Sequence, residues 1–230
     1  MKSFIIYLEN SQTRKHVDEM HDILSEFGFE NTLFPGITGD KAKELQLSDN
    51  RVIDFNAEKH PIHIEYLNRP GVLGCFYSHY SLWKKCVELN EPIFIFEEDI
   101  VFYQKYTPVD FNGILLVCVN FQGRSNEEVE NKLLYFEKFF EESNSDPYII
   151  PCTQDPIPGA CGYLIQPDSA KKLCDIYKYS YDAIDHCITN KNVNVFYHSK
   201  LMGRELFPSE GKRISQTLGT EYGNPIRMVL

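Results

Sequence analysis

The chain alternates short apolar runs with longer segments in which apolar residues recur at three- and four-residue steps. Residues 4–8 are an apolar run bounded by polar residues, a pattern typical of a buried strand. Helical spacing follows over residues 13–27, in the apolar set Val17, Met20, Leu24 and Phe27, and Gly28 comes next as a stop signal. The pattern therefore predicts a strand and then an amphipathic helix.

Further along, the pattern predicts more strands and helices in alternation. Residues 71–89 carry apolar side chains at helical spacing, and residues 93–96 are four consecutive apolar residues, as in a strand buried on both faces. The other predicted strands are residues 32–34, 113–119, 161–165 and 193–197, and the other predicted helices are residues 127–140 and 167–177. Few apolar anchors occur before Arg51, residues 54–70 are expected to be a loop, and the tail from residue 203 is expected to wrap the surface.

Size and charge narrow the possible functions. The 230 residues are enough for one domain with a real core. With 33 acidic against 23 basic residues the net charge is -10, which argues against nucleic acid as a partner. A nucleotide diphosphate stays compatible, because a bound divalent cation can neutralise it locally. No run approaches the roughly 18 to 20 apolar residues of a membrane span, so no transmembrane segment is expected, and only peripheral membrane contact stays open.

The cysteines and the N-terminus suggest a reducing compartment. The seven cysteines form no C-x-x-C pair, and their number is odd. The first apolar run is too short for a signal peptide and turns polar at once. We therefore expect free, mostly buried thiols in a cytoplasmic protein.

The strand at residues 93–96 ends in three consecutive acids, Glu97, Glu98 and Asp99. Clustered carboxylates raise each other's pKa unless a positive charge neutralises them, and a hard divalent cation can do so. Ligands of open α/β sheets bind beyond the carboxyl ends of the strands, which is where these acids are expected. Alternation would point Glu97 and Asp99 the same way, with Glu98 turned aside. The alternative is a solvated acidic turn.

Three further segments could carry chemistry, and each also has an ordinary structural explanation. Ser78 and His79 fall in the predicted helix before the acidic strand, where a single histidine is often a satisfied core residue. The glycines of PGACGYLI could let a backbone approach a ligand, or could reflect tight packing. Asp182 is a credible helix N-cap, whereas Asp185 and His186 could face a cleft.

The order of these segments is more specific than any one of them. Arg14 in the first helix and PGITG come first; G-x-x-G-C-x-x-S-H-x-x-x-W at residues 71–83 then precedes the acids of residues 97–99. Later come GACGYLI, A-x-K-L at residues 170–173, and a segment ending in Ile184-Asp185. This order resembles glycosyltransferase family 25, which includes bacterial lipooligosaccharide galactosyltransferases and collagen galactosyltransferases. The chain departs from the family pattern at Glu98, where the family has Asp, and at Ala183, where it has Pro.

The resemblance implies an α/β fold of the GT-A, Rossmann-like type, with a mixed, mostly parallel sheet flanked by helices. It also implies one glycosyltransferase domain over residues 1–230, with a nucleotide-sugar and metal half at about 1–110 and an acceptor half at about 111–230. The expected reaction is transfer of a hexose, first of all galactose, from a UDP-sugar to a glycan or glycoconjugate acceptor. The transfer is expected to invert the anomeric centre and to need Mn²⁺ or Mg²⁺.

Site residues follow from the resemblance, position by position. The donor is expected to bind at Tyr7, Arg14, Ser78, His79, Glu97 and Gly162. The expected metal ligands are Asp99, Glu97 and His198. Asp185 is the first choice of general base, and Asp155 in the Pro-rich loop is the second.

Two other functions stay open at this point. One is a catalytically inactive GT-A-like module that binds a nucleotide or a glycan. The other is a metal-dependent hydrolase, although the chain has no H-x-x-E-H or H-E-x-x-H pattern to support it.

Overall fold

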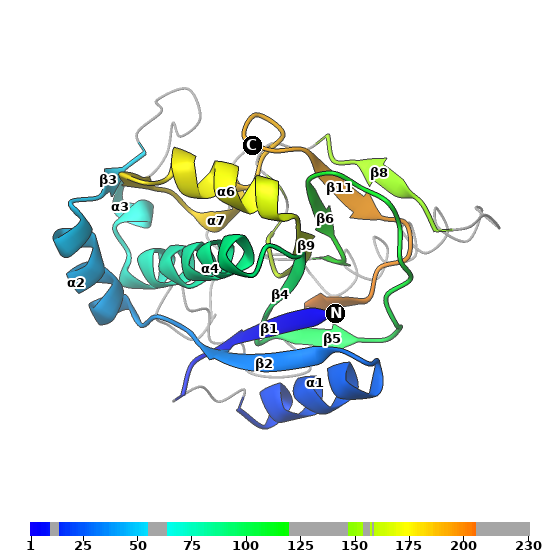
Figure 1. Ribbon diagram of the computed structural model, residues 1–230. Coiled ribbons are helices and arrows are strands. Elements are labelled where there is room, and N and C mark those ends of the chain that lie inside the picture. The colour runs from blue at the N-terminus through cyan, green and yellow to red at the C-terminus, as the bar shows by residue number, and fades with distance from the viewer. Residues whose placement is uncertain (10–13, 55–63, 120–146, 154–156, 158, 206–230) are drawn as a thin grey trace, which may run out of the picture.

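A computed structural model gives the architecture of the protein (Figure 1). The structure describes residues 1–9, 14–54, 64–119, 147–153, 157 and 159–205. The predicted helix at residues 127–140 and the candidate base Asp155 lie outside these residues.

A seven-stranded sheet is the centre of the fold, in the order β2-β1-β4-β9-β6-β11-β8. Its strands are β1 (Lys2–Tyr7), β2 (Glu30–Pro35), β4 (Ile93–Glu97), β6 (Ile114–Leu116), β8 (Ile149–Pro151), β9 (Gly162–Ile165) and β11 (Val195–His198). The β1–β2, β1–β4 and β6–β11 pairs are parallel, whereas β9 and β8 run against their neighbours. The sheet is therefore mixed with most strands in one direction, which confirms the predicted fold class.

Helices cover both faces of this sheet. They are α1 (Arg14–Glu26), α2 (Gly39–Asp49), α3 (Ile64–Leu67), α4 (Pro70–Leu89), α6 (Pro167–Ile176) and α7 (Ile184–Cys187). Figure 1 shows α4 and α6 on one side of the sheet and α1 on the other. Two small sheets complete the fold: β10 (Ser180–Tyr181) with β3 (Val52–Ile53), and β12 (Gly203–Glu205) between β5 (Ile100–Phe102) and β7 (Cys118–Val119).

Strand β4 shows why the sheet is sandwiched. Its residues Ile93, Phe94, Ile95 and Phe96 are all fully buried, as predicted for a strand covered on both faces. Ile93 and Ile95 pack into the core under α4, whereas Phe94 and Phe96 pack into a second core with α1. Because successive side chains of a strand point to opposite faces, four apolar residues in a row require two cores.

Four predictions of local structure were wrong or incomplete. The expected loop at residues 54–70 contains the short helix α3. Helix α2 occupies part of the polar stretch before Arg51; its one fully packed side chain is Ala42, so its apolar pattern is too weak to read. The predicted strand at residues 113–119 is divided between β6 and β7, which belong to different sheets. The tail begins with β12, which pairs with two strands, so residues 203–205 do not simply wrap the surface.

Two other expectations about the chain agree with the structure. All seven cysteines are free, and all except Cys174 are buried. Among the described residues, no helix combines the length and the apolar character needed to cross a membrane.

Candidate active site

Three parallel strands end at one edge of the sheet and bring the N-terminal motifs together. The register pairs Ile6 of β1 with Glu97 of β4, and Tyr7 of β1 with Pro35 of β2. Just beyond the strands, the Gly36 N–H donates to the Tyr7 carbonyl oxygen at 2.7 Å. The PGITG turn and the acidic turn therefore flank the end of β1, as the rule for ligand sites of α/β sheets predicts.

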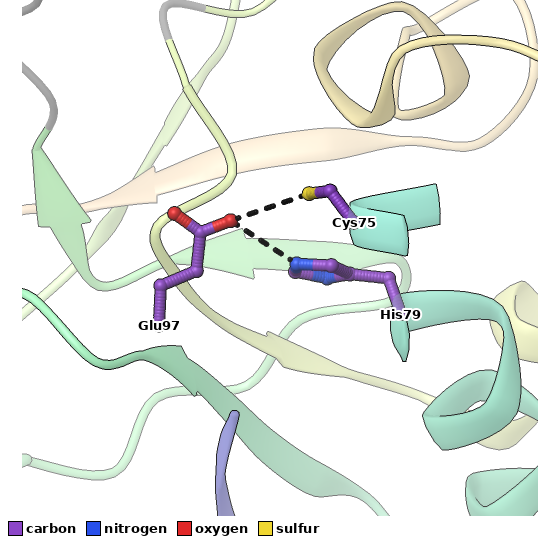
Figure 2. A group of neighbouring side chains, drawn as sticks. All are labelled: Cys75, His79 and Glu97. Carbon is purple, nitrogen blue, oxygen red and sulfur yellow. Dashed lines mark hydrogen bonds and ion pairs between the residues drawn. The ribbon is translucent and has the colours of Figure 1, made fainter. Parts of the chain in front are cut away.

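Helix α4 presents two side chains to Glu97. Cys75 and His79 are four residues apart and so lie on one face of the helix. The Cys75 thiol donates to Glu97 Oε1 at 3.6 Å, and His79 Nε2 lies 3.3 Å from the same oxygen. Figure 2 shows both side chains reaching this carboxylate from α4. One ligand atom from each of the three lies within 4.8 Å of the others, a grouping that no other set of three such residues forms in the described chain.

The other ring nitrogen of His79, Nδ1, faces the core. His79 Nδ1 lies 2.8 Å from the hydroxyl of Tyr163, and the Trp83 indole N–H donates to that hydroxyl at 2.9 Å. The rings of His79 and Tyr163 are stacked with centroids 5.8 Å apart. Trp83 and Tyr163 are fully buried, so a polar chain connects the interior to the edge of the sheet.

Asp185, the first-choice base, comes to the same place from α7. Its Oδ1 accepts a hydrogen bond from the Ala160 N–H at 2.9 Å. Burial and the negative charge of Glu97 raise the pKa of Asp185 to about 6. The negative charge of Glu97 is therefore close enough to act on Asp185, and Asp185 can exchange a proton near neutral pH.

The same pair of carboxylates acts on Cys75. Burial, Glu97 and Asp185 together raise the pKa of the Cys75 thiol well above its usual range. The thiol therefore stays protonated and serves as a hydrogen-bond donor to Glu97.

Two expected donor-binding residues have clear structural partners. Ser78 Oγ donates to the Gly74 carbonyl at 2.7 Å and accepts from the Ile37 N–H at 2.8 Å, so it ties the PGITG turn to α4. A Cβ on Gly162 would lie 2.6 Å from Cys118 Sγ, so this glycine is needed for close packing beside β7. Both residues help to build the edge of the sheet, and their contacts with a donor stay predictions.

Tyr7 and Arg14 form a pair at the end of β1. The Arg14 guanidinium lies 4.9 Å from the centroid of the Tyr7 ring and 3.1 Å from Asp18. Arg14 is exposed, whereas Tyr7 is buried. The pair thus places an exposed cation at the end of β1.

The three acids of the acidic turn, Glu97, Glu98 and Asp99, have different surroundings. Glu98 is buried and accepts a hydrogen bond from the Leu8 N–H at 3.0 Å, so it ties the ends of β4 and β1 together. Asp99 is partly exposed and outside the group that Glu97 forms with Cys75 and His79. Burial is the main cause of the raised pKa of the Cys118 thiol, and the negative charge of Asp99 raises it further.

His198 and Asp182 are held by neighbours other than those expected. His198 is fully buried; its Nε2 lies 2.7 Å from the Thr107 carbonyl oxygen, and its Nδ1 accepts from the Lys200 N–H at 2.8 Å. Both ring nitrogens are therefore engaged by the backbone, and a metal-binding role for His198 stays a prediction. Asp182 Oδ1 accepts a hydrogen bond from the Ala183 N–H. Ala183 itself occupies the N-cap of α7, so the prediction that Asp182 is the N-cap was wrong.

Sequence reasoning did not single out Cys75 or Tyr163 as members of the site. The four-residue spacing of Cys75 and His79 was a usable signal, because it places both on one helix face. Tyr163 is 84 residues from His79, and no local pattern could reveal that contact.

Comparison with known proteins identifies the family. The family model described as "Glycosyltransferase family 25 (LPS biosynthesis protein)" matches residues 1–188. The chain belongs to this family. The match includes all of the described site, from Tyr7 to Asp185, and confirms the resemblance that the order of motifs indicated.

Individual relatives cover less of the chain. A "Glycosyltransferase 25 family member" from Aedes aegypti is 26% identical over 181 residues, which are 75% of this chain and 27% of the relative. "Procollagen galactosyltransferase 1-A" of Xenopus laevis is 32% identical over 100 residues, 43% of this chain and 16% of the relative. "Lipooligosaccharide biosynthesis protein lex-1" of Haemophilus influenzae is 29% identical over 157 residues, 61% of this chain and 49% of the relative. The matches thus span from about a sixth to about half of these relatives' lengths.

Proposed function

We propose that the protein transfers a hexose, galactose in the first place, from a UDP-sugar to a glycan or glycoconjugate acceptor, with inversion and with the help of a divalent cation. The observation that carries this proposal is the meeting of Glu97, His79 and Asp185 beyond the carboxyl ends of parallel strands. Family membership supplies the reaction class, and the name of the Xenopus relative supports galactose.

The donor side of the site has the charges that a nucleotide diphosphate needs. Arg14 offers an exposed guanidinium, whose fork of N–H groups matches phosphate oxygens. Tyr7, Ser78, His79 and Gly162 line the same edge in this proposal, through direct contact or by shaping the backbone. The nearby carboxylates would repel the diphosphate without a cation between them.

The acidic turn suits such a cation better than the three-residue group around His79 does. Hard cations such as Mn²⁺ and Mg²⁺ prefer oxygen ligands, whereas Cys75, His79 and Glu97 offer one sulfur, one nitrogen and one oxygen. The partly exposed Glu97 and Asp99 supply two carboxylates, and diphosphate oxygens and water would supply the rest. When bound, the cation stabilises the charge of the leaving diphosphate.

Asp185 has the properties of the base in this reaction. The acceptor hydroxyl oxygen forms a bond to the anomeric carbon, its proton passes to the Asp185 carboxylate, and the bond to the diphosphate breaks with its electron pair on the leaving group. A carboxyl with a pKa of about 6 is largely ionised at neutral pH and is still basic enough to accept the proton. Attack from the face opposite the leaving group inverts the anomeric centre.

A panel of sugar nucleotides tests the donor and the cation together. We expect UDP-galactose with Mn²⁺ to raise the melting temperature and to be turned over slowly to free galactose and UDP. Asp99→Asn should abolish transfer and leave the melting temperature of the free protein near that of wild type. Full transfer activity of Asp99→Asn would contradict the metal assignment.

The same panel separates the enzyme from an inactive binding module. Stabilisation by UDP or a UDP-sugar without hydrolysis or transfer, across several acceptors, would favour the module. The relative named for lipooligosaccharide biosynthesis and the relative named for procollagen suggest the first acceptors to try.

A further inference from the structure

A hydrogen-bonded chain of four side chains runs from the core to Glu97. It begins at Trp83 of α4, passes through Tyr163 of β9, returns to His79 of α4 and ends on Glu97 at the end of β4. The three successive distances are 2.9, 2.8 and 3.3 Å. His79 has 1% of its side chain exposed and Glu97 has 26%, so solvent reaches the chain mainly at the carboxylate.

The chemistry of these groups fixes the direction of each bond. The indole N–H of Trp83 can only donate, so the Tyr163 oxygen accepts there. Tyr163 has one hydroxyl proton, and His79 Nδ1 is its other hydrogen-bond partner among the described residues. The hydroxyl therefore donates to Nδ1, and a neutral imidazole then carries its proton on Nε2, facing the carboxylate of Glu97.

We propose that Trp83 and Tyr163 are positioning residues, which hold the His79 ring in the tautomer with its proton on Nε2 and through it fix the carboxylate of Glu97. Cys75 supplies a second donor to the same carboxylate oxygen, as the two dashed lines in Figure 2 show. Two donors on one oxygen set the orientation of the Glu97 carboxylate. The use of this carboxylate on the donor side rests on the proposed function.

The tautomer also decides what the three-residue group can bind. A sulfur, a nitrogen and an oxygen within 4.8 Å would suit Zn²⁺ by ligand type. To bind it, His79 Nε2 would have to lose its proton, and Nδ1 would have to donate to a Tyr163 oxygen that already accepts from Trp83. The chain of bonds therefore opposes zinc at this position.

NMR of the histidine side chains labelled with ¹⁵N tests the tautomer without any substrate. The resonances of His79 are assigned from their loss in His79→Gln. We expect Nε2 to carry the proton at neutral pH and Nδ1 to carry none. A protonated Nδ1 in the wild-type protein would overturn the proposal.

Tyr163→Phe tests the role of the hydroxyl in the same spectrum. This variant removes the donor to Nδ1, so we expect a mixture of the two tautomers. The matched control is Tyr177→Phe, because Tyr177 is also fully buried and its hydroxyl accepts from Asn192 at 3.0 Å, away from His79. The control should leave the His79 resonances unchanged; a wild-type tautomer in Tyr163→Phe would count against positioning by Tyr163.

Two substitutions of His79 test the consequence for binding. His79→Gln keeps an amide N–H donor at about the reach of Nε2, whereas His79→Asn is too short to reach Glu97. We expect His79→Gln to bind a UDP-sugar within a few-fold of wild type and His79→Asn to lose on the order of tenfold or more. Equal losses in both would contradict the donor role of Nε2.

A zinc measurement completes the test. Equilibrium dialysis of the wild-type protein against Zn²⁺ should show no stoichiometric site that Cys75→Ser removes, and such a site would overturn the proposal. If no UDP-sugar binds at all, the proposed function fails, while the NMR result still decides the tautomer.

Discussion

Two buried histidines of this protein have opposite surroundings. His79 bonds two side chains, the hydroxyl of Tyr163 and the carboxylate of Glu97, and it lies where parallel strands end. His198 bonds two backbone groups, the Thr107 carbonyl and the Lys200 N–H. Burial alone does not separate them, because each has at most 1% of its surface exposed.

The partners of each histidine indicate its role. His198 joins the segments that contain Thr107 and Lys200 through hydrogen bonds to their backbone groups. Burial lowers the pKa of His198, so it stays neutral. One side-chain partner of His79, Glu97, also raises the pKa of Asp185, and the same carboxylate reaches solvent. A buried histidine that links a core hydroxyl to a half-exposed carboxylate is thus better placed for chemistry than one that links two peptide groups.

On the His79 side of this comparison, the substitution with the greatest effect on transfer should be Asp185→Asn. Asp185→Asn removes the proposed base and keeps an oxygen that can accept from Ala160, so transfer should fall by about 10² to 10⁴-fold while donor affinity is kept. Asp182→Asn is the matched control, since its buried side chain can still accept from the Ala183 N–H. Steady-state transfer assays compare the two, and unchanged turnover in Asp185→Asn would remove this residue from the mechanism.

On the His198 side, we expect His198→Ala to have an effect of intermediate size, and this effect is on the free energy of unfolding. His198→Ala leaves Thr107 and Lys200 without their buried partner, at a cost of about 2 to 4 kcal/mol in the free energy of unfolding. His79→Gln should cost only about 1 kcal/mol, because an amide can replace a hydrogen bond.

Urea denaturation measures both stabilities, and transfer is then expressed per folded molecule. We expect His198→Ala to keep its transfer rate on that basis. A stable His198→Ala variant that no longer binds Mn²⁺ would instead restore the sequence-based prediction that His198 is a metal ligand.

The least change is expected in the stability cost of Asp185, the proposed base. The pKa of Asp185 is raised from 3.8 to about 6 in the fold, so the folded state binds more protons than the unfolded state between these values. Stability is therefore lost as the pH rises through this window, and Asp185→Asn should be about 1 to 2 kcal/mol more stable than wild type at neutral pH, after a discount for partial exposure.

The sign of this effect can be checked by urea denaturation at two pH values. The advantage of Asp185→Asn should be full above about pH 6 and should disappear below about pH 3.8. An equal advantage at both pH values would mean that it does not come from the charge of Asp185.

The sequence was most informative where periodicity and burial coincide. Strand β4 and helices α1 and α4 were predicted because their apolar residues form continuous or regularly spaced sets that a core must bury. The acidic turn was found for the related reason that polar residues directly follow a fully buried strand. Helix α2 was missed because only Ala42 is fully packed, so its stability comes from contact with α4 instead of its own pattern.

The candidate site could be predicted only in part. Asp185, Glu97 and His79 were named from motifs, yet their meeting depends on the order in which the strands pair. The partners that distinguish His79 from His198 come from distant parts of the chain, Tyr163 in one case and Thr107 in the other. A single sequence gives the residue types at a site, whereas the direction of each hydrogen bond follows from the folded arrangement.

Asp185 and Glu97 form one electrostatically coupled pair at the site. An NMR titration of the Asp185 side-chain carboxyl, in wild type and in Glu97→Gln, tests it without any assay of transfer. We predict a pKa of about 6 in wild type and a clearly lower value in Glu97→Gln, because the neighbouring negative charge is gone. A wild-type pKa near 3.8, or the same pKa in both proteins, would contradict the coupling of Asp185 to Glu97.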